Sequence, residues 1–373
     1  MRTRVTDMLG IEFPIFAFSH CRDVVAAVSR AGGMGVLGAL YFTPEELEVE
    51  LAWIDEHAGG RPYGVDVVMP ASYEGAGLDV DSPEDLVARL QGMIPEGHRR
   101  FVDGLLAAHG VAELPDSEAG AGKVLLGWTD ATARPQVEVA LRHPIALLAN
   151  ALGPPPADVV EAAHARGVRV AALASTPRHA VKQVEVGVDI VVAQGTEAGG
   201  HTGDISTMVL IPQVVDAVDV PVLAAGGIGN GRQMAAGMAL GAEGVWTGSV
   251  WLAVEEADTP EPARRRILAA TSRDTVRSRS WTGKPARLLR NEWTEAWEAE
   301  GSPGTLPMPL QFMLVSDALR RIGRSDAAEL ATFPAGQIIG AMNQVRSAKE
   351  VVFTMVEEYI EAVERLGRLS GDG

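Results

Sequence analysis

The sequence predicts an α/β protein in which eight parallel strands and their helices close into a (β/α)₈ barrel. Short apolar runs recur eight times along the chain, and stretches that favour amphipathic helices separate them. The composition agrees, because 47% hydrophobic residues, 41 glycines and 22 prolines suit many short elements joined by tight turns. Eight repeats are what a closed barrel requires, whereas a doubly wound open sheet usually stops at about five to seven strands.

The eight apolar runs can be placed in order along the chain. They are residues 13–18, 34–40, 63–69, 145–149, 169–174, 189–194, 221–225 and 244–247. Helices are expected between them, for example over 23–30 and 44–57, where Thr43 can cap the helix and Pro44 suits its first position. A last helix is expected over 348–366, packed back on the barrel.

Changes in composition predict a second, smaller domain inserted near the C-terminus. Residues 1–255 plus 335–373 are assigned to the TIM barrel, with 71–122 as an inserted loop with one or two helices. Residues 256–334 carry charge clusters, three tryptophans (Trp281, Trp293, Trp297) and a Pro/Gly stretch. We expect this region to form a mainly helical domain that covers the substrate at the barrel mouth.

Charge and cysteine content exclude several classes of function. The formal net charge of −17 repels phosphate backbones and anionic membranes, so neither nucleic acid nor membrane is an expected partner. An anionic ligand must then be held by local devices such as backbone N–H groups and helix N-termini. Cys21 is the only cysteine, which excludes an intramolecular disulfide and a cysteine-based metal site. The N-terminal residues resemble neither a signal peptide nor a membrane span, and a cytoplasmic location is expected.

Two glycine-rich loops follow the last two predicted strands. Residues 224–231 read AAGGIGNG, and residues 247–249 read TGS. Loops seven and eight form the usual phosphate site of such barrels, so together they predict a phosphate cradle. Tight turns without a ligand are the alternative interpretation. A dinucleotide-binding motif is disfavoured, because no acidic residue ends the following strand.

A third loop follows the sixth strand and carries the candidate catalytic residue. Residues 194–204 read QGTEAGGHTGD, with four glycines, two carboxylates and His201. Such a loop is poor in helix or strand formers but can wrap its backbone around a ligand. A histidine in a loop is usually solvated, but His201 follows two glycines at the C-terminal end of a strand. This position predicts an active-site role.

These segments resemble the nitronate monooxygenase family, formerly called 2-nitropropane dioxygenases, within a superfamily that includes FMN-dependent enoyl-thioester reductases. The resemblance lies in QGTEAGGH at 194–201, PVLAAGGI at 221–228 and the Gly248-Ser249 turn. It extends to AGGMGVLG at 31–38, TGKPAR at 282–287 and PAGQIIG at 334–340.

The resemblance implies FMN, no metal and a set of site residues. The flavin phosphate would lie on Gly226, Gly227, Gly248 and Ser249, and Gln194 would approach the ribityl chain or the ring. His201 would stand over the substrate side of the ring. The remaining residues expected beside the cofactor are Ala17, Phe18, Asp66, Gly199 and Gly200.

The chain also departs from the family's pattern. Ala17-Phe18 stands where many members have Pro-Met, and Asp66 stands where many have Asn. An ionised Asp66 would oppose an anionic reduced flavin unless it were protonated or paired. Ser19-His20-Cys21 adds another candidate acid or base at the mouth of the first strand.

The resemblance implies that FMN and O₂ oxidise an alkyl nitronate to a carbonyl compound and nitrite, with His201 as base or hydrogen-bonding group. The alternative is an NAD(P)H-dependent reductase or dehydrogenase acting on an enoyl or cyclic acyl-thioester. The phosphates of an acyl-CoA thioester could then contact Arg264–Arg266, or Lys284 and Arg287. A non-catalytic flavin-binding barrel is a third alternative, against which the retained phosphate glycines and His201 argue. The oligomeric state stays open, a homodimer included.

Overall fold

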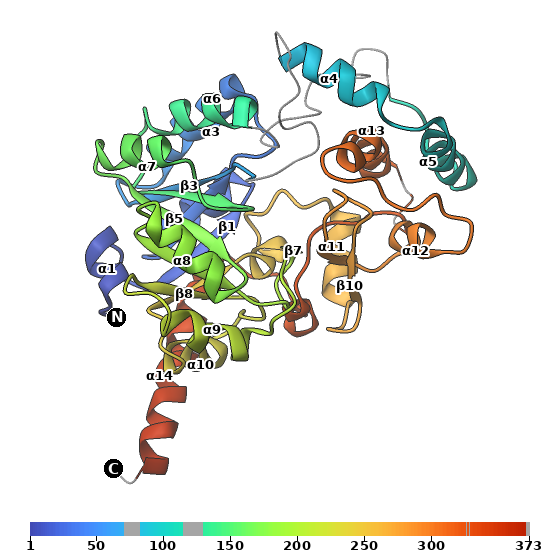
Figure 1. The fold of residues 1–373 in the computed structure, drawn as a ribbon. Coiled ribbons are helices and arrows are strands. Elements are labelled where there is room, and N and C mark those ends of the chain that lie inside the picture. The colour runs from blue at the N-terminus through green and yellow to red at the C-terminus, as the bar shows by residue number, and fades with distance from the viewer. Residues whose placement is uncertain (71–82, 115–129, 326, 328, 371–373) are drawn as a thin grey trace.

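The computed structural model describes residues 1–70, 83–114, 130–325, 327 and 329–370. Its centre is a closed parallel barrel in which the last strand pairs with the first (Figure 1). All eight predicted apolar runs overlap its strands, so the predicted fold class is confirmed. The strands are β1 (Ile15–Ser19), β2 (Met34–Gly38), β3 (Tyr63–Val68), β4 (Leu147–Ala151), β5 (Arg169–Ala174), β6 (Ile190–Gln194), β8 (Val222–Ala225) and β9 (Gly244–Thr247).

Helices surround the barrel, and the cap predicted from the sequence at Thr43 is present. Thr43 and Glu46 form a capping box at the start of α3, and Pro44 takes the first helical position. The C-terminal helix packs on its neighbours as expected and continues past 366 to residue 370. The surrounding helices are α2 (Arg22–Arg30), α3 (Pro44–His57), α6 (Asp130–Ala140), α7 (Ala157–His164), α8 (Pro177–Glu185), α9 (Thr207–Val215), α10 (Gly231–Ala239) and α14 (Ala348–Ser370).

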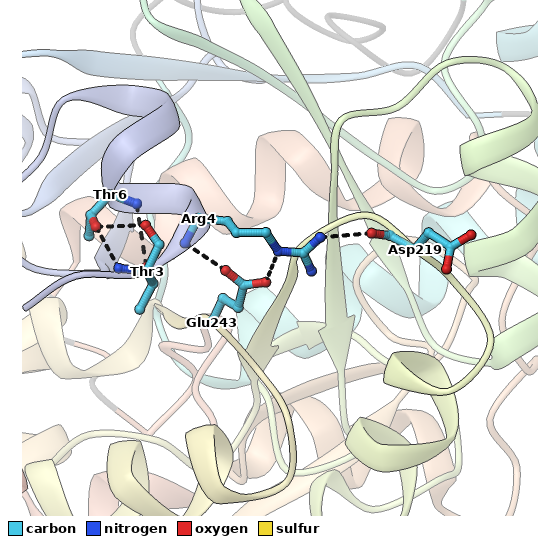
Figure 2. A network of polar contacts seen from close by, with 5 residues as sticks. All are labelled: Thr3, Arg4, Thr6, Asp219 and Glu243. Carbon is cyan, nitrogen blue, oxygen red and sulfur yellow. Dashed lines mark hydrogen bonds and ion pairs between the residues drawn. The ribbon is translucent and has the colours of Figure 1, made fainter.

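A short N-terminal helix, α1 (Arg4–Leu9), closes the end of the barrel at which the strands begin. Its residues Val5 and Leu9 belong to the same apolar cluster as the interior side chains of the barrel. Arg4 holds the helix in place: its backbone N–H donates to Glu243 at 2.7 Å, and its guanidinium pairs with Glu243 and donates to the Asp219 carbonyl (Figure 2). With this end filled, only the C-terminal ends of the strands can form a site.

A second lobe lies to one side of the barrel mouth (Figure 1). The predicted insertion contributes α4 (Pro83–Gly92) and α5 (Glu96–Ala108), which pack against α13 of the region from 256 to 334. That region also contains two antiparallel strands, which the sequence pattern does not predict. Its elements are α11 (Glu261–Ala269), β10 (Thr275–Ser278), β11 (Ala286–Leu289), α12 (Glu292–Glu298) and α13 (Leu310–Arg324). Within the described part of the chain, no helix is both long and apolar enough to cross a membrane.

Gly35 of β2 lies in the segment AGGMGVLG at 31–38, and close packing requires glycine at this position. A Cβ atom on this residue would lie 2.2 Å from the Val25 carbonyl oxygen, because α2 packs directly on the strand. Only glycine permits this approach.

We therefore predict that Gly35→Ala lowers the free energy of unfolding by about 3 kcal/mol or more, since backbone must move to admit the methyl group. Gly104→Ala in α5 is the matched control: a Cβ there meets nothing within 4 Å, and helix propensity favours alanine by up to about 1 kcal/mol. Urea unfolding measures both variants, and equal stabilities would contradict the proposed close packing.

Candidate active site at the C-terminal ends of the strands

A cavity of about 960 Å³ opens at the C-terminal ends of the barrel strands, between the barrel and the second lobe. Ala17 is the one predicted site residue that does not line it, because its side chain is fully buried in the cluster outside the barrel. The predicted residues that line it are Phe18, Asp66, Gln194, Gly199, Gly200, His201, Gly226, Gly227, Gly248 and Ser249. The fold thus brings together residues from β1, β3, β6, β8 and β9.

Three glycines with available backbone amides line one side of the cavity. Gly226 and Gly227 have φ values of +97° and +69°, a conformation that glycine adopts without strain. Within the described part of the chain, the N–H groups of Gly226, Gly227 and Gly248 donate to no protein acceptor. Backbone amides at such turns can bind an anion, so these N–H groups are candidates for the predicted phosphate site.

The start of α10 is less available to an anion than its sequence indicates. The Gly229 N–H donates to the Gln233 side chain, the Gly231 N–H to Glu358, and the Gln233 N–H to Asn230. The protein therefore satisfies the N–H groups of Gly231 and Gln233 in this helix, and that of Gly229 just before it. A phosphate would depend on the glycine amides that precede it and on the turn after β9.

Glu197 of the glycine-rich loop has a structural role. Its carboxylate accepts hydrogen bonds from the Thr207 backbone N–H at 2.9 Å and from the Thr207 hydroxyl at 2.8 Å, at the first residue of α9. A carboxylate at a helix N-terminus is favoured by the helix dipole. The Thr207 hydroxyl also lies 2.9 Å from the Gly226 carbonyl oxygen, so this contact joins the loop after β6 to the loop after β8.

His201 is held between the barrel and the second lobe. Gly200 and His201 form the two-residue strand β7, which pairs antiparallel with β11. The His201 Nδ1 atom lies 3.2 Å from the Pro285 carbonyl oxygen, which can only accept, so Nδ1 carries the proton of the neutral ring. Nε2 is then the basic nitrogen, 3.3 Å from the Thr282 hydroxyl.

The surroundings keep His201 neutral. The pKa of His201 is lowered to about 4, mainly by burial; the hydrogen bond to Pro285 opposes this lowering, and the positive charge of Lys284 makes a smaller contribution to it. A neutral imidazole with a basic Nε2 can accept a proton at neutral pH.

The structure changes the expectation for the basic residues of the second lobe. Arg287 is 8% exposed and donates to the Thr196 carbonyl at 2.9 Å and to Thr275. Arg264 and Arg266 donate to backbone carbonyls of their own lobe. The cavity is lined by Lys284 but not by Arg264, Arg265, Arg266 or Arg287, so the lining supports the suggested phosphate contact only for Lys284.

Two further titratable groups line the β1–β3 side of the cavity. The His20 Nδ1 atom lies 2.8 Å from the Gly38 carbonyl oxygen, and burial lowers the pKa of His20. Burial raises the pKa of Asp66 to about 7, and within the described residues its carboxyl group has no hydrogen-bond or ion-pair partner. Cys21 does not line the cavity: its thiol donates to the Glu256 carbonyl, and burial raises its pKa.

We predict that Asp66→Asn flattens the dependence of stability on pH. In the folded chain Asp66 keeps its proton up to about pH 7, whereas in the unfolded chain it loses it near 3.8, so stability falls as pH rises between these values. The variant lacks this penalty and should be more stable than the parent at pH 8, by at most about 4 kcal/mol. Urea unfolding at constant FMN content from pH 4 to pH 8 measures it, with the exposed Asp103→Asn as control. Parallel curves for parent and Asp66→Asn would contradict it.

Thr282 and Leu152 are among the cavity residues that the sequence did not single out. Thr282 lies in the segment TGKPAR, which was noted only as part of the resemblance, so a signal for it existed. Leu152 follows β4 and has a φ of +68°, the only positive value at a non-glycine residue within the described residues. A leucine before Gly153 carries no sequence signal for that conformation.

At the C-terminal ends of its strands this barrel carries a large cavity lined by glycines and a neutral, half-buried histidine, which is the framework of a barrel enzyme. The family model for nitronate monooxygenase matches residues 2–358. The chain therefore belongs to the nitronate monooxygenase family, a family of oxidoreductases.

Relatives and solved structures agree with this assignment. A Mycobacterium tuberculosis protein with only a provisional name as a monooxygenase is 56% identical over 100% of this chain and 99% of its own length. A provisionally named nitronate monooxygenase of Staphylococcus saprophyticus is 31% identical over 79% of this chain and 80% of the relative. The structure of nitroalkane oxidase from Streptomyces ansochromogenes matches with a TM-score of 0.79 and 28% identity, over 98% of this chain and 100% of that one. FabK from Thermotoga maritima matches with a TM-score of 0.75 and 28% identity, over 98% of both chains.

Proposed function

We propose that this protein binds FMN and oxidises an alkyl nitronate with O₂ to a carbonyl compound and nitrite. Two nitronates and one O₂ then give two carbonyl groups and two nitrite ions. The observation that carries the proposal is the neutral His201, which lines a cavity whose glycine amides donate to no acceptor among the described residues.

The cavity fits FMN on two counts. The N–H groups of Gly226, Gly227 and Gly248 are available to a phosphate and carry no side chains that would block it. A volume of about 960 Å³ lies at the upper end of small-molecule sites and can hold a flavin mononucleotide together with a substrate. When bound, FMN supplies the electron acceptor that the reaction needs.

The residues of the chain have distinct roles in this proposal. The glycine amides hold the phosphate, and Gln194 and Phe18 lie where they can contact the remainder of the cofactor. Nε2 of His201 accepts a proton from the carbon of a neutral nitroalkane, and its new N–H then donates to the nitronate oxygens. A nitronate supplied directly raises the pKa of His201, because a nearby anion favours the charged imidazolium.

The rival function is an FMN reductase or dehydrogenase that uses NAD(P)H and acts on an enoyl or cyclic acyl-thioester. Two observations favour it as the alternative: the cavity is large, and Lys182 and Lys284 line it, where they could attract a thioester's phosphates. The likeness to FabK, at a TM-score of 0.75, belongs to the same argument.

We predict that His201→Asn retains FMN and loses turnover by about 10²-fold or more, as expected when a general base is removed. Asparagine can replace the contact of Nδ1 with Pro285 but cannot take a proton. Flavin absorbance of the purified variant measures cofactor content, and steady-state oxidation of a nitroalkane measures the rate. Unchanged turnover would remove His201 from the mechanism.

We further predict that a nitronate alone rapidly bleaches the FMN-loaded protein in the absence of oxygen. The measurement is anaerobic stopped-flow absorbance at about 450 nm, with the nitronate and with NADH or NADPH in separate experiments. Rapid bleaching by a nicotinamide, with the nitronate inert, would replace the proposed function by the reductase.

A further inference from the structure

The cavity has an apolar wall opposite the glycine amides. Three consecutive barrel strands end in an apolar residue there: Leu40 just after β2, Val68 in β3 and Leu152 after β4. Trp281 of the second lobe lines the same region. These four side chains form one cluster with Met308 and Phe312, which lie behind them.

Leu152 is placed in this wall by an unfavourable backbone conformation. Its φ of +68° brings Cβ too close to the backbone for most side chains, and a residue of this kind is found where surrounding contacts impose it. Asn150 supplies these contacts: its side chain accepts from the Met69 N–H at 2.8 Å and donates to the Gly153 carbonyl at 2.9 Å. Because Asn150 is only 1% exposed, its two hydrogen bonds hold the turn after β4 in one conformation and thereby direct the Leu152 side chain into the wall.

The two sides of the cavity differ in chemistry. The ends of β6, β8 and β9 present Gln194, glycine amides and His201 with its loop, all suited to polar groups. The ends of β2 to β4 present mainly hydrocarbon, with Asp66 of β3 as a polar exception. A ligand that fills both sides has a polar, reactive head and an apolar tail.

We propose that Leu152 sets substrate selectivity, and that the apolar wall binds a hydrocarbon chain whose anionic head lies at His201. The identity of the head as a nitronate rests on the function proposed above. The hydrocarbon chain does not, because it is inferred from the wall alone.

Straight-chain carboxylates of two to ten carbons test the wall without requiring any reaction. A carboxylate is planar and anionic like a nitronate but is not oxidised by flavin. Titration calorimetry with the FMN-loaded protein should give a Kd that falls by up to about fourfold for each added methylene, until the wall is filled and the Kd levels off. A Kd that does not depend on chain length would overturn the proposal.

Substitutions at Leu152 test its role in selectivity. The chain length beyond which the Kd stops falling should be longer for Leu152→Ala and shorter for Leu152→Phe. Leu152→Gly also removes the side chain but suits the positive φ, so it tests the same shift in a variant without the backbone cost. Leu369→Ala, at a 74% exposed position of α14, is the matched control and should leave the chain-length profile unchanged. If Leu152→Gly and Leu152→Phe leave the profile at its original length in folded, FMN-loaded protein, Leu152 has no such role.

The same series of chain lengths, offered as nitronates, separates this inference from the proposed function. Nitronates that fail to react at every length, while carboxylates keep the chain-length dependence, would refute the nitronate reaction and support the apolar wall. Nitronates that react with kcat/KM independent of length, in parent and variants alike, would support the reaction and overturn the role of the wall.

Discussion

The pairing of β7 with β11 is the contact on which the site depends. Two residues, Gly200 and His201, join the loop after β6 to the second lobe, and the Pro285 carbonyl beside that pairing orients the imidazole. Further contacts strengthen the same junction: Arg287 donates to Thr196, and the Gln337 N–H donates to the Glu197 carbonyl at 2.9 Å. The catalytic candidate therefore belongs neither to the barrel nor to the lobe alone, and a shift between the two would move it.

Burial of titratable groups is the second constraint, and it acts on two sides of the cavity. It lowers the pKa of His201 to about 4 and raises that of Asp66 to about 7. Both effects favour the uncharged form, because a charge inside a cavity walled by protein loses its hydration. The departure from Asn to Asp at position 66 thus adds a group that can be neutral or negative near neutral pH, and occupation of the cavity by an anion would favour its protonated form.

Much of the fold and part of the site could be predicted because their signals are local in the sequence. The eight apolar runs, the Thr43 cap and the glycine loops each reside in a few adjacent residues, and parallel strands bring their C-terminal ends to one face by geometry. The strands of the second lobe were missed because β10 and β11 are four residues each and β11 pairs with a loop some 85 positions away, as Ala286 with His201. The sequence could not show that Arg264 and Arg287 donate to protein carbonyls, because those carbonyls are brought near only by the folded chain.

The sequence by itself determined the barrel, the family and the glycine and histidine segments, since these follow from composition, periodicity and short motifs. The tertiary structure decided which atoms of those segments are available. The N–H groups of Gly229, Gly231 and Gln233 donate to the side chains of Gln233, Glu358 and Asn230. The contact with Pro285 leaves Nε2 as the basic nitrogen of His201, and the hydrogen bonds of Asn150 hold Leu152 in the cavity wall. The physical reason is that hydrogen-bond partners and burial depend on residues far apart in the chain, and only the closed barrel with its second lobe brings them together.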